Sequence, residues 1–202
     1  INQATRLFER LVVDSPDDVF NLVELMYLRS SSYIELEKRN LPEAINSYRK
    51  SIHTLEELRS KIKTPSIGAA LAHYYSCMGS ALRKAGQPNQ AIKFHQKSID
   101  LCIPILANNP WYTDVEKQIA DSQFDFALAL RDLSKHHEMQ EMSQKAIDIY
   151  ENLLRKHPTN YYYVETLSTL HYMLADAYET NGDWDTAESH YLRSIAIESS
   201  YV

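Results

Sequence analysis

Few residues of this sequence have the types and the spacing that chemistry requires. His136, His137 and Glu138 form the most suggestive cluster. A helical zinc-peptidase motif places two histidines four residues apart with a glutamate between them, so that both imidazoles face the metal. Adjacent histidines on a helix point in different directions. The cluster is therefore interpreted as part of a solvent-exposed turn.

The cysteines and the scattered carboxylates also have simple structural interpretations. Cys77 and Cys102 are too few for a disulfide framework and lack zinc-site spacing, so we expect two buried free thiols. The neighbouring carboxylates suit helix starts and solvated helix faces. These pairs are Asp17-Asp18, Glu56-Glu57 and Asp121/Asp125.

No Gly-rich phosphate loop and no nucleophile elbow occur in the sequence. We therefore predict no catalytic, cofactor-binding or metal-binding residues, no cofactor and no enzymatic activity. The 27 acidic residues outnumber the 21 basic ones, giving a net charge of −6. Because nucleic-acid affinity comes mainly from Lys and Arg, we expect no nucleic-acid partner. No apolar run reaches the ~20 residues of a membrane span, and no signal peptide is visible, so we expect no membrane insertion and a cytoplasmic location.

The elements that carry these residues follow an internal repeat. A small residue followed by Ile recurs at Ser51, Ser98, Ala146 and Ser194, with 47 or 48 residues between neighbours. Two further sets of mostly small residues keep nearly the same spacing. They are Ser32, Gly79, Ala127 and Ala175, and Ala44, Ala91, Met139 and Ala187.

Turn-forming residues divide each repeat into two helices. Prolines, which cannot continue a helix, mark the joints between repeats at Pro16, Pro65, Pro110 and Pro158. A second break lies inside each repeat, at 39–42, 86–88, 134–136 and 181–183. Asn40 and Asp183 are good N-cap residues there, and Gly86 and Gly182 suit the left-handed residue that ends a helix.

We therefore predict a single all-α array over residues 1–202. Residues 1–16 match the second helix of a later repeat and are expected to close a preceding one. Because the chain also begins at Ile1 rather than Met, we expect it to be part of a longer protein. The four following repeats are predicted at 17–64, 65–110, 111–158 and 159–202.

The signature residues resemble those of the tetratricopeptide repeat. The best match runs from His171 to Tyr178 and continues through Gly182, Ala187, Tyr191 and Ser194. The resemblance implies a right-handed α-α superhelix of antiparallel helix pairs. The period of about 48 residues exceeds the family's usual 34, which two extra turns per helix would explain. Such long-helix repeats resemble arrays in kinesin light chains and bacterial signalling proteins.

In this family the first helix of each pair lines a concave groove that receives peptides or helices. Carrying the groove positions onto this sequence gives a predicted groove in which several side chains are aromatic or apolar. Its residues are Arg29, Tyr33, Leu36, Ser76, Ser80, Arg83, Lys84, Phe124, Leu128, Arg131, Tyr172, Asp176 and Glu179.

The predicted groove is mildly basic at its middle, through Arg29, Arg83, Lys84 and Arg131, which favours a segment with acidic and aromatic side chains. The clamp that grips chaperone C-termini is disfavoured, because its positions carry Arg29, Tyr33, Cys77, Asp121 and Asp125. The aspartates would repel a terminal carboxylate. Tyr161, Tyr162 and Tyr163 open a helix, where partial core burial is the default interpretation and a partner contact the alternative.

Three functions remain open at this point. The first is a protein-interaction or scaffold module that binds a protein or peptide ligand, within a larger signalling or assembly protein. The second is a rigid spacer or self-association array. The third is a regulatory or sensory arm of an enzyme, such as a bacterial Ser/Thr kinase, whose catalytic domain lies outside this chain.

Overall fold

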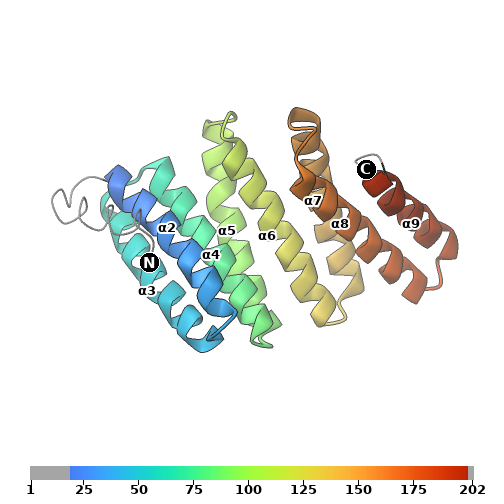
Figure 1. Ribbon diagram of the computed structural model, residues 1–202, viewed down its shortest axis with the longest axis horizontal. Helices are drawn as coiled ribbons and strands as arrows, with labels where there is room; N and C mark the ends of the chain where they lie inside the picture. Colours follow the sequence, from blue (N-terminus) through green and yellow to red (C-terminus); the bar gives the residue numbers. More distant parts are fainter. Residues whose placement is uncertain (1–18, 200–202) are drawn as a thin grey trace. The chain divides into compact units, whose positions relative to one another are not determined.

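Every element in the described part of the chain is an α-helix. The computed structural model describes residues 19–199, apart from the side chains of residues 19–22 and Ser32 (Figure 1). The helices are α2 (Val19–Glu37), α3 (Leu41–Lys61), α4 (Pro65–Lys84), α5 (Pro88–Asn108), α6 (Thr113–Asp132), α7 (His136–Lys156), α8 (Tyr161–Thr180) and α9 (Trp184–Ser199). The predicted helix within 1–16 and the small side chain of Ser32 lie outside this description.

The predicted turn residues end and begin the helices. The Asn40 side chain accepts a hydrogen bond from the Glu43 amide at 3.3 Å, and Asp183 accepts one from Thr186 at 3.2 Å. Gly86 and Gly182 adopt φ of 72° and 80° in the turns that follow α4 and α8. These positions confirm the helix–turn–helix prediction.

The turn between α6 and α7 has no glycine. Ser134 takes the left-handed conformation there, with φ of 56°. A residue with a Cβ costs about 1 kcal/mol in that region. His136 and His137 begin α7 rather than lying in this turn, so the predicted turn placement is wrong. His137 instead lies 3.6 Å from Glu141, one helical turn along an exposed face.

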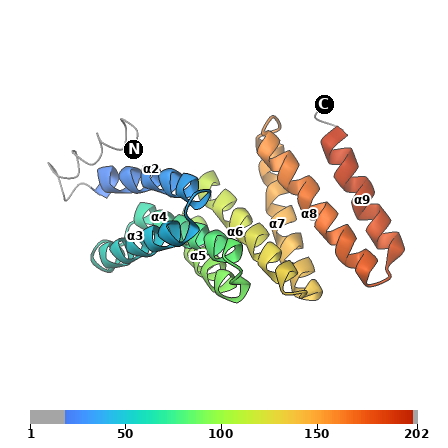
Figure 2. The same cartoon turned by 60° about the horizontal axis from the view of Figure 1, so that its bottom comes forward.

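The helices pack as consecutive antiparallel pairs within two compact units, Ile1–Pro110 and Trp111–Val202. In the first unit, α4 packs against α3 and α5, and α2 packs against α3 and α4. In the second unit, α7 packs against α6 and α8, and α8 packs against α9. Figures 1 and 2 show α8 and α9 side by side, joined by a short turn.

The core of the second unit lies between α7 and α8. A helix pair buries only part of its apolar face, so the next pair must cover the rest. Tyr150 and Leu153 on α7 are fully buried together with Val164 and Leu170 on α8. Ile147, part of the repeated small-Ile step, belongs to the same cluster.

The repeated small residues mark the closest helix contacts. Gly79 on α4 faces the ring of His95 on α5 so closely that a Cβ at residue 79 would lie 2.6 Å from that ring. Ala127 and Ala175, at the equivalent positions, have no exposed surface. The small-residue period is thus explained by helix packing.

The first prediction concerns this close contact. Gly79→Ala should lower the free energy of unfolding by about 1–3 kcal/mol, because the enclosed His95 ring cannot move aside. Gly68→Ala on the same helix is the matched control. Its Cβ would meet only the flexible tip of Ile105, 2.8 Å away, so its effect should lie between zero and a gain of about 1 kcal/mol. Urea unfolding measures both, and equal effects would contradict the packing argument.

His95 also makes the fold sensitive to acid. Its side chain is fully buried and neither ring nitrogen has a hydrogen-bond partner. Burial, together with the nearby positive charge of Arg83, lowers the pKa of His95 from its ordinary 6.5 to about 3. The folded chain therefore holds this imidazole neutral at pH values where the unfolded chain protonates it.

The second prediction follows from that difference in proton uptake. The His95 contribution is intact above pH 6.5 and is lost as pH falls toward 3, because only the unfolded chain binds the proton in that window. Stability should fall by up to about 1 kcal/mol per pH unit. His95→Phe, compared with the parent chain by urea unfolding at about pH 7 and about pH 5, should reduce this loss. An unchanged pH dependence would show that His95 does not cause it.

Candidate functional site

The predicted groove of the first unit is carried by α2 and α4, which lie side by side. Most of its side chains are half-buried, and Lys84 is exposed. Ser76 departs from the expectation of an open surface, because it is only 6% exposed. The half-buried residues are Arg29, Tyr33, Leu36, Ser80 and Arg83.

Lys84 connects the two helices through an ion pair. Its Nζ donates to Glu37 Oε2 at 2.6 Å. The Glu37 side chain is only 4% exposed, and it also accepts a hydrogen bond from the Tyr48 hydroxyl at 2.7 Å. Lys84 therefore neutralises a buried carboxylate, so its charge is already used within the fold.

Tyr33 belongs to a cluster of aromatic rings. Its ring lies edge-on to Tyr48 at 5.6 Å and to Tyr74 at 6.5 Å. The Tyr74 hydroxyl donates to the Met26 carbonyl at 2.5 Å. Burial raises the pKa of Tyr48 and of Tyr74, so both hydroxyls remain protonated donors. The floor of this part of the predicted groove is thereby fixed.

The predicted groove of the second unit is more open along α8. Tyr172 is 56% exposed, and its ring lies edge-on to Tyr191 of α9 at 5.5 Å. Tyr191 in turn donates to Glu179 at 2.7 Å. Asp176 is exposed on the same helix.

The α6 part of this face is mixed. Arg131 is exposed and Phe124 is half-buried against the core cluster. Leu128 is only 8% exposed, so it contributes to the interior rather than to a surface. Of the predicted groove residues on α6, Phe124 and Arg131 are thus the accessible ones.

Asp121 does not lie on the solvated face that the sequence suggested. It accepts hydrogen bonds from the hydroxyls of Tyr150 at 2.5 Å and Tyr162 at 2.9 Å. Lys117 donates to its other oxygen at 2.6 Å and lies 4.5 Å above the Tyr162 ring. The correction has a physical cause: a buried hydroxyl requires an acceptor, and Asp121 is the acceptor within reach.

The three consecutive tyrosines, Tyr161, Tyr162 and Tyr163, differ in burial. Tyr163 is buried, as the default interpretation expects, whereas Tyr161 and Tyr162 are 66% and 42% exposed.

Cys102 is buried, and burial raises its pKa to about 12. Cys77 is only half-buried, with its sulfur 3.6 Å from His73 Nε2, so the expectation of two buried thiols is wrong for Cys77.

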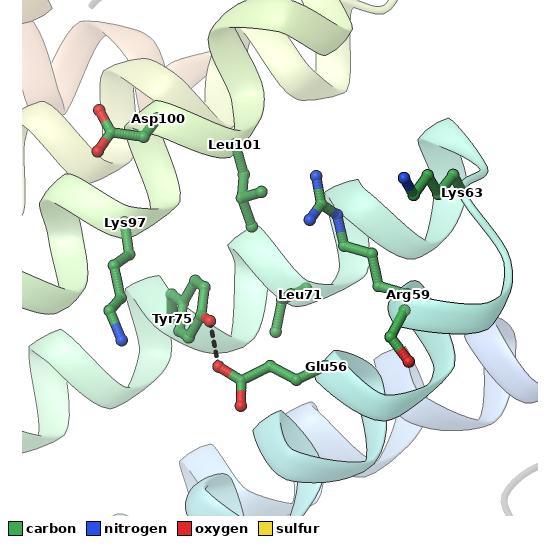
Figure 3. A pocket seen from close by; sticks show the side chains of 9 residues that line it. Glu56, Arg59, Lys63, Leu71, Tyr75, Lys97, Asp100 and Leu101 are labelled. Atoms are coloured by element: carbon green, nitrogen blue, oxygen red, sulfur yellow. Dashed lines mark hydrogen bonds between the residues drawn. The ribbon is translucent and has the colours of Figure 1, made fainter.

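A pocket of about 480 Å³ opens in the first unit between α3, α4 and α5 (Figure 3). No pattern in the sequence indicated this pocket. Its charged side chains come from α3, from the residues just after α3 and from α5, so no local motif brings them together. Only the repeat spacing could have indicated that 56–63 and 97–101 approach each other across α4.

Across residues 19–199, no group of three or more His, Cys, Asp and Glu side chains is arranged to hold a metal ion. Within the same residues, none of the helices combines the length and the apolar character that crossing a bilayer requires.

Comparisons with known proteins identify the fold. A tetratricopeptide-repeat family model matches residues 170–200. The crystal structure of MamA is similar over 97% of this chain and 87% of that one, with a TM-score of 0.56 and 19% identity. BtubC (BKLC) from P. vanneervenii is similar over 98% and 88%, with a TM-score of 0.51 and 18% identity.

None of the curated proteins compared with the sequence matches it. The family match thus covers the second half of α8 and all of α9, and the described residues have an all-α helix-pair fold similar to that of MamA and BtubC.

The third prediction concerns the Lys84–Glu37 pair. Lys84→Met should lower the free energy of unfolding by about 1–3 kcal/mol, because it leaves the buried Glu37 carboxylate without its cation. Lys38→Met is the control, since Lys38 and Glu35 are 67% and 64% exposed and such pairs contribute about 0–1 kcal/mol. Thermal and urea unfolding measure both. Equal losses would mean that Lys84 has no special structural role.

Proposed function

We propose that the chain is a protein-interaction module that binds a peptide or helical segment of a partner along the first helices of its repeats. The exposure of Tyr172 is the observation that carries this proposal. A tyrosine at 56% exposure on a helix whose neighbouring residues are buried offers a large, rigid contact at low entropic cost. Repeat proteins use such extended faces for binding.

The exposed cation on α6 and the exposed Tyr172 ring on α8 define the ligand more closely. Arg131 is exposed on α6, and it forms no ion pair within the described residues. Lys84 and Asp121 each form an ion pair within the chain, so neither indicates the charge of the partner. We infer a segment that presents acidic and aromatic side chains, because these complement Arg131 and stack on Tyr172.

The relatives support an interaction role only through their fold. Their identities below 25% do not carry over a partner. The proposed module would serve a larger signalling or assembly protein. A regulatory arm of an enzyme and a rigid, self-associating spacer are the competing functions.

The fourth prediction tests the proposal by peptide selection. Displayed random peptides are selected on the purified chain, and the enriched sequences are measured by fluorescence anisotropy. Acidic and aromatic residues should be enriched. Tyr172→Ala and Arg131→Glu should each weaken binding about 10-fold or more, as expected for central interface residues.

Lys145→Glu is the matched control for charge, because Lys145 is exposed on α7, the second helix of its pair. It should leave affinity within about two-fold at physiological salt. Light scattering across a concentration series tests the competing function of a self-associating spacer. If no peptide is enriched and the chain self-associates with rising concentration, the spacer reading replaces the interaction module.

A further inference from the structure

The pocket between α3, α4 and α5 combines an apolar floor with a basic rim. Leu71 and Tyr75 on α4 and Leu101 on α5 form the floor. Arg59 and Lys63 come from the last turn of α3 and from the residues just after it. Figure 3 shows the Arg59 guanidinium directed over the floor toward Leu101, with Lys97 at the opposite side of Tyr75.

The two carboxylates of the pocket are already engaged. Glu56 accepts a hydrogen bond from the Tyr75 hydroxyl, and Asp100 accepts one from Gln96 at 2.8 Å. In Figure 3 the Asp100 carboxylate also points away from Arg59. Within residues 19–199, neither carboxylate forms an ion pair with Arg59 or Lys63.

The cations have capacity left for a ligand. Lys97 lies over the Tyr75 and Phe94 rings, at 5.2 and 5.3 Å from their centroids, and these contacts leave its ammonium donors available. Arg59 and Lys63 form neither a hydrogen bond nor an ion pair through their side chains within residues 19–199. A guanidinium beside apolar side chains is suited to bidentate binding of a carboxylate.

The second unit supplies an internal comparison, because the repeat places equivalent residues in α7, α8 and α9. Glu151 corresponds to Glu56 and Arg193 to Lys97, and there the two form an ion pair at 3.4 Å. Leu154 stands where the first unit has Arg59, and it packs against the core cluster. The repeat architecture thus does not require an arginine at residue 59.

His171 occupies the place that Tyr75 has in the first unit. Its Nδ1 lies 3.0 Å from His190 Nδ1, within hydrogen-bond distance. Glu151 pairs with Arg193 instead of with His171. In the first unit the Tyr75 hydroxyl donates a hydrogen bond to Glu56. The three cations that lack an ion pair are therefore a property of this pocket and not of the fold.

We propose that this pocket binds the C-terminal residue of a peptide, with its free carboxylate on Arg59 and Lys63 and a bulky apolar side chain on Leu71 and Leu101. The cavity of about 480 Å³ lies within the range of ligand pockets. A terminal Leu or Phe carries its carboxylate and its apolar side chain on the same Cα, which matches a guanidinium directed over a leucine floor.

This site is separate from the predicted groove. At about 100° per residue, Leu71 and Tyr75 lie on the side of α4 opposite to Ser80 and Lys84.

The experiment titrates the full ¹⁵N-labelled chain with an N-acetylated pentapeptide, glycine-serine-glycine-serine-phenylalanine, and follows its amide NMR signals. The largest shifts should fall on α3, α4 and α5 around Arg59 and Leu101. The same peptide with an amidated C-terminus should bind about 10-fold more weakly or worse, because it lacks the charged acceptor.

Arg59→Leu introduces the residue that the second unit already holds at this place, so the fold should tolerate it. It should weaken the free-acid peptide about 10-fold, whereas Lys50→Leu, with the same charge change on an exposed part of α3, should leave affinity within about two-fold. Tyr172→Ala should have no effect here, which separates this site from the groove function.

Three results would overturn the proposal. If the free-acid and amidated peptides bind equally, the pocket does not recognise the terminal carboxylate. If Arg59→Leu leaves the affinity for the free-acid peptide unchanged, Arg59 does not bind that carboxylate. N-acetylphenylalanine binding as tightly as the pentapeptide would assign the pocket to free small acids rather than to a peptide terminus.

Discussion

The close approach of the two helices in each pair is the constraint on which the rest of the structure depends. Gly79 has no room for a Cβ beside His95, and Ala175 is fully enclosed at the equivalent place. Once two helices lie this close, the side chains above and below the contact have fixed directions. The next pair must then cover the apolar residues that remain, as α8 covers Ile147 and Tyr150.

The sequence predicted the helix ends well because the signals there are local. Asn40, Gly86 and Gly182 act through their own backbone or through residues three or four positions away. The same reasoning placed His136 wrongly, since the turn before it lacks a glycine and uses Ser134 in a left-handed conformation. Where the usual turn residue was missing, the position of the helix start could not be predicted to the residue.

The candidate site was harder to predict, because its interactions join residues far apart in the sequence. The family resemblance placed Tyr172 and Leu128 in one predicted groove, yet it could not show that Tyr172 is exposed and Leu128 is buried. Lys84 meets Glu37 across 47 residues, and Tyr162 meets Asp121 across 41. Sequence spacing gives the face of a helix, whereas the partner of a polar group depends on how neighbouring helices pack.

The two units show how one architecture supports different surfaces. Packing fixes the enclosed positions, where Leu71 and Leu167 are alike and both buried. The position of Tyr75 and His171 is also buried, but it differs in polar chemistry. Tyr75 engages Glu56, whereas burial lowers the pKa of His171 to about 4 and the neutral ring pairs with His190. In the second unit the equivalent glutamate, Glu151, pairs with Arg193 of the following helix, whereas Glu56 is held by Tyr75. Ligand selectivity can therefore diverge between repeats through side chains at the pocket rim, while the residues that set helix spacing stay constrained.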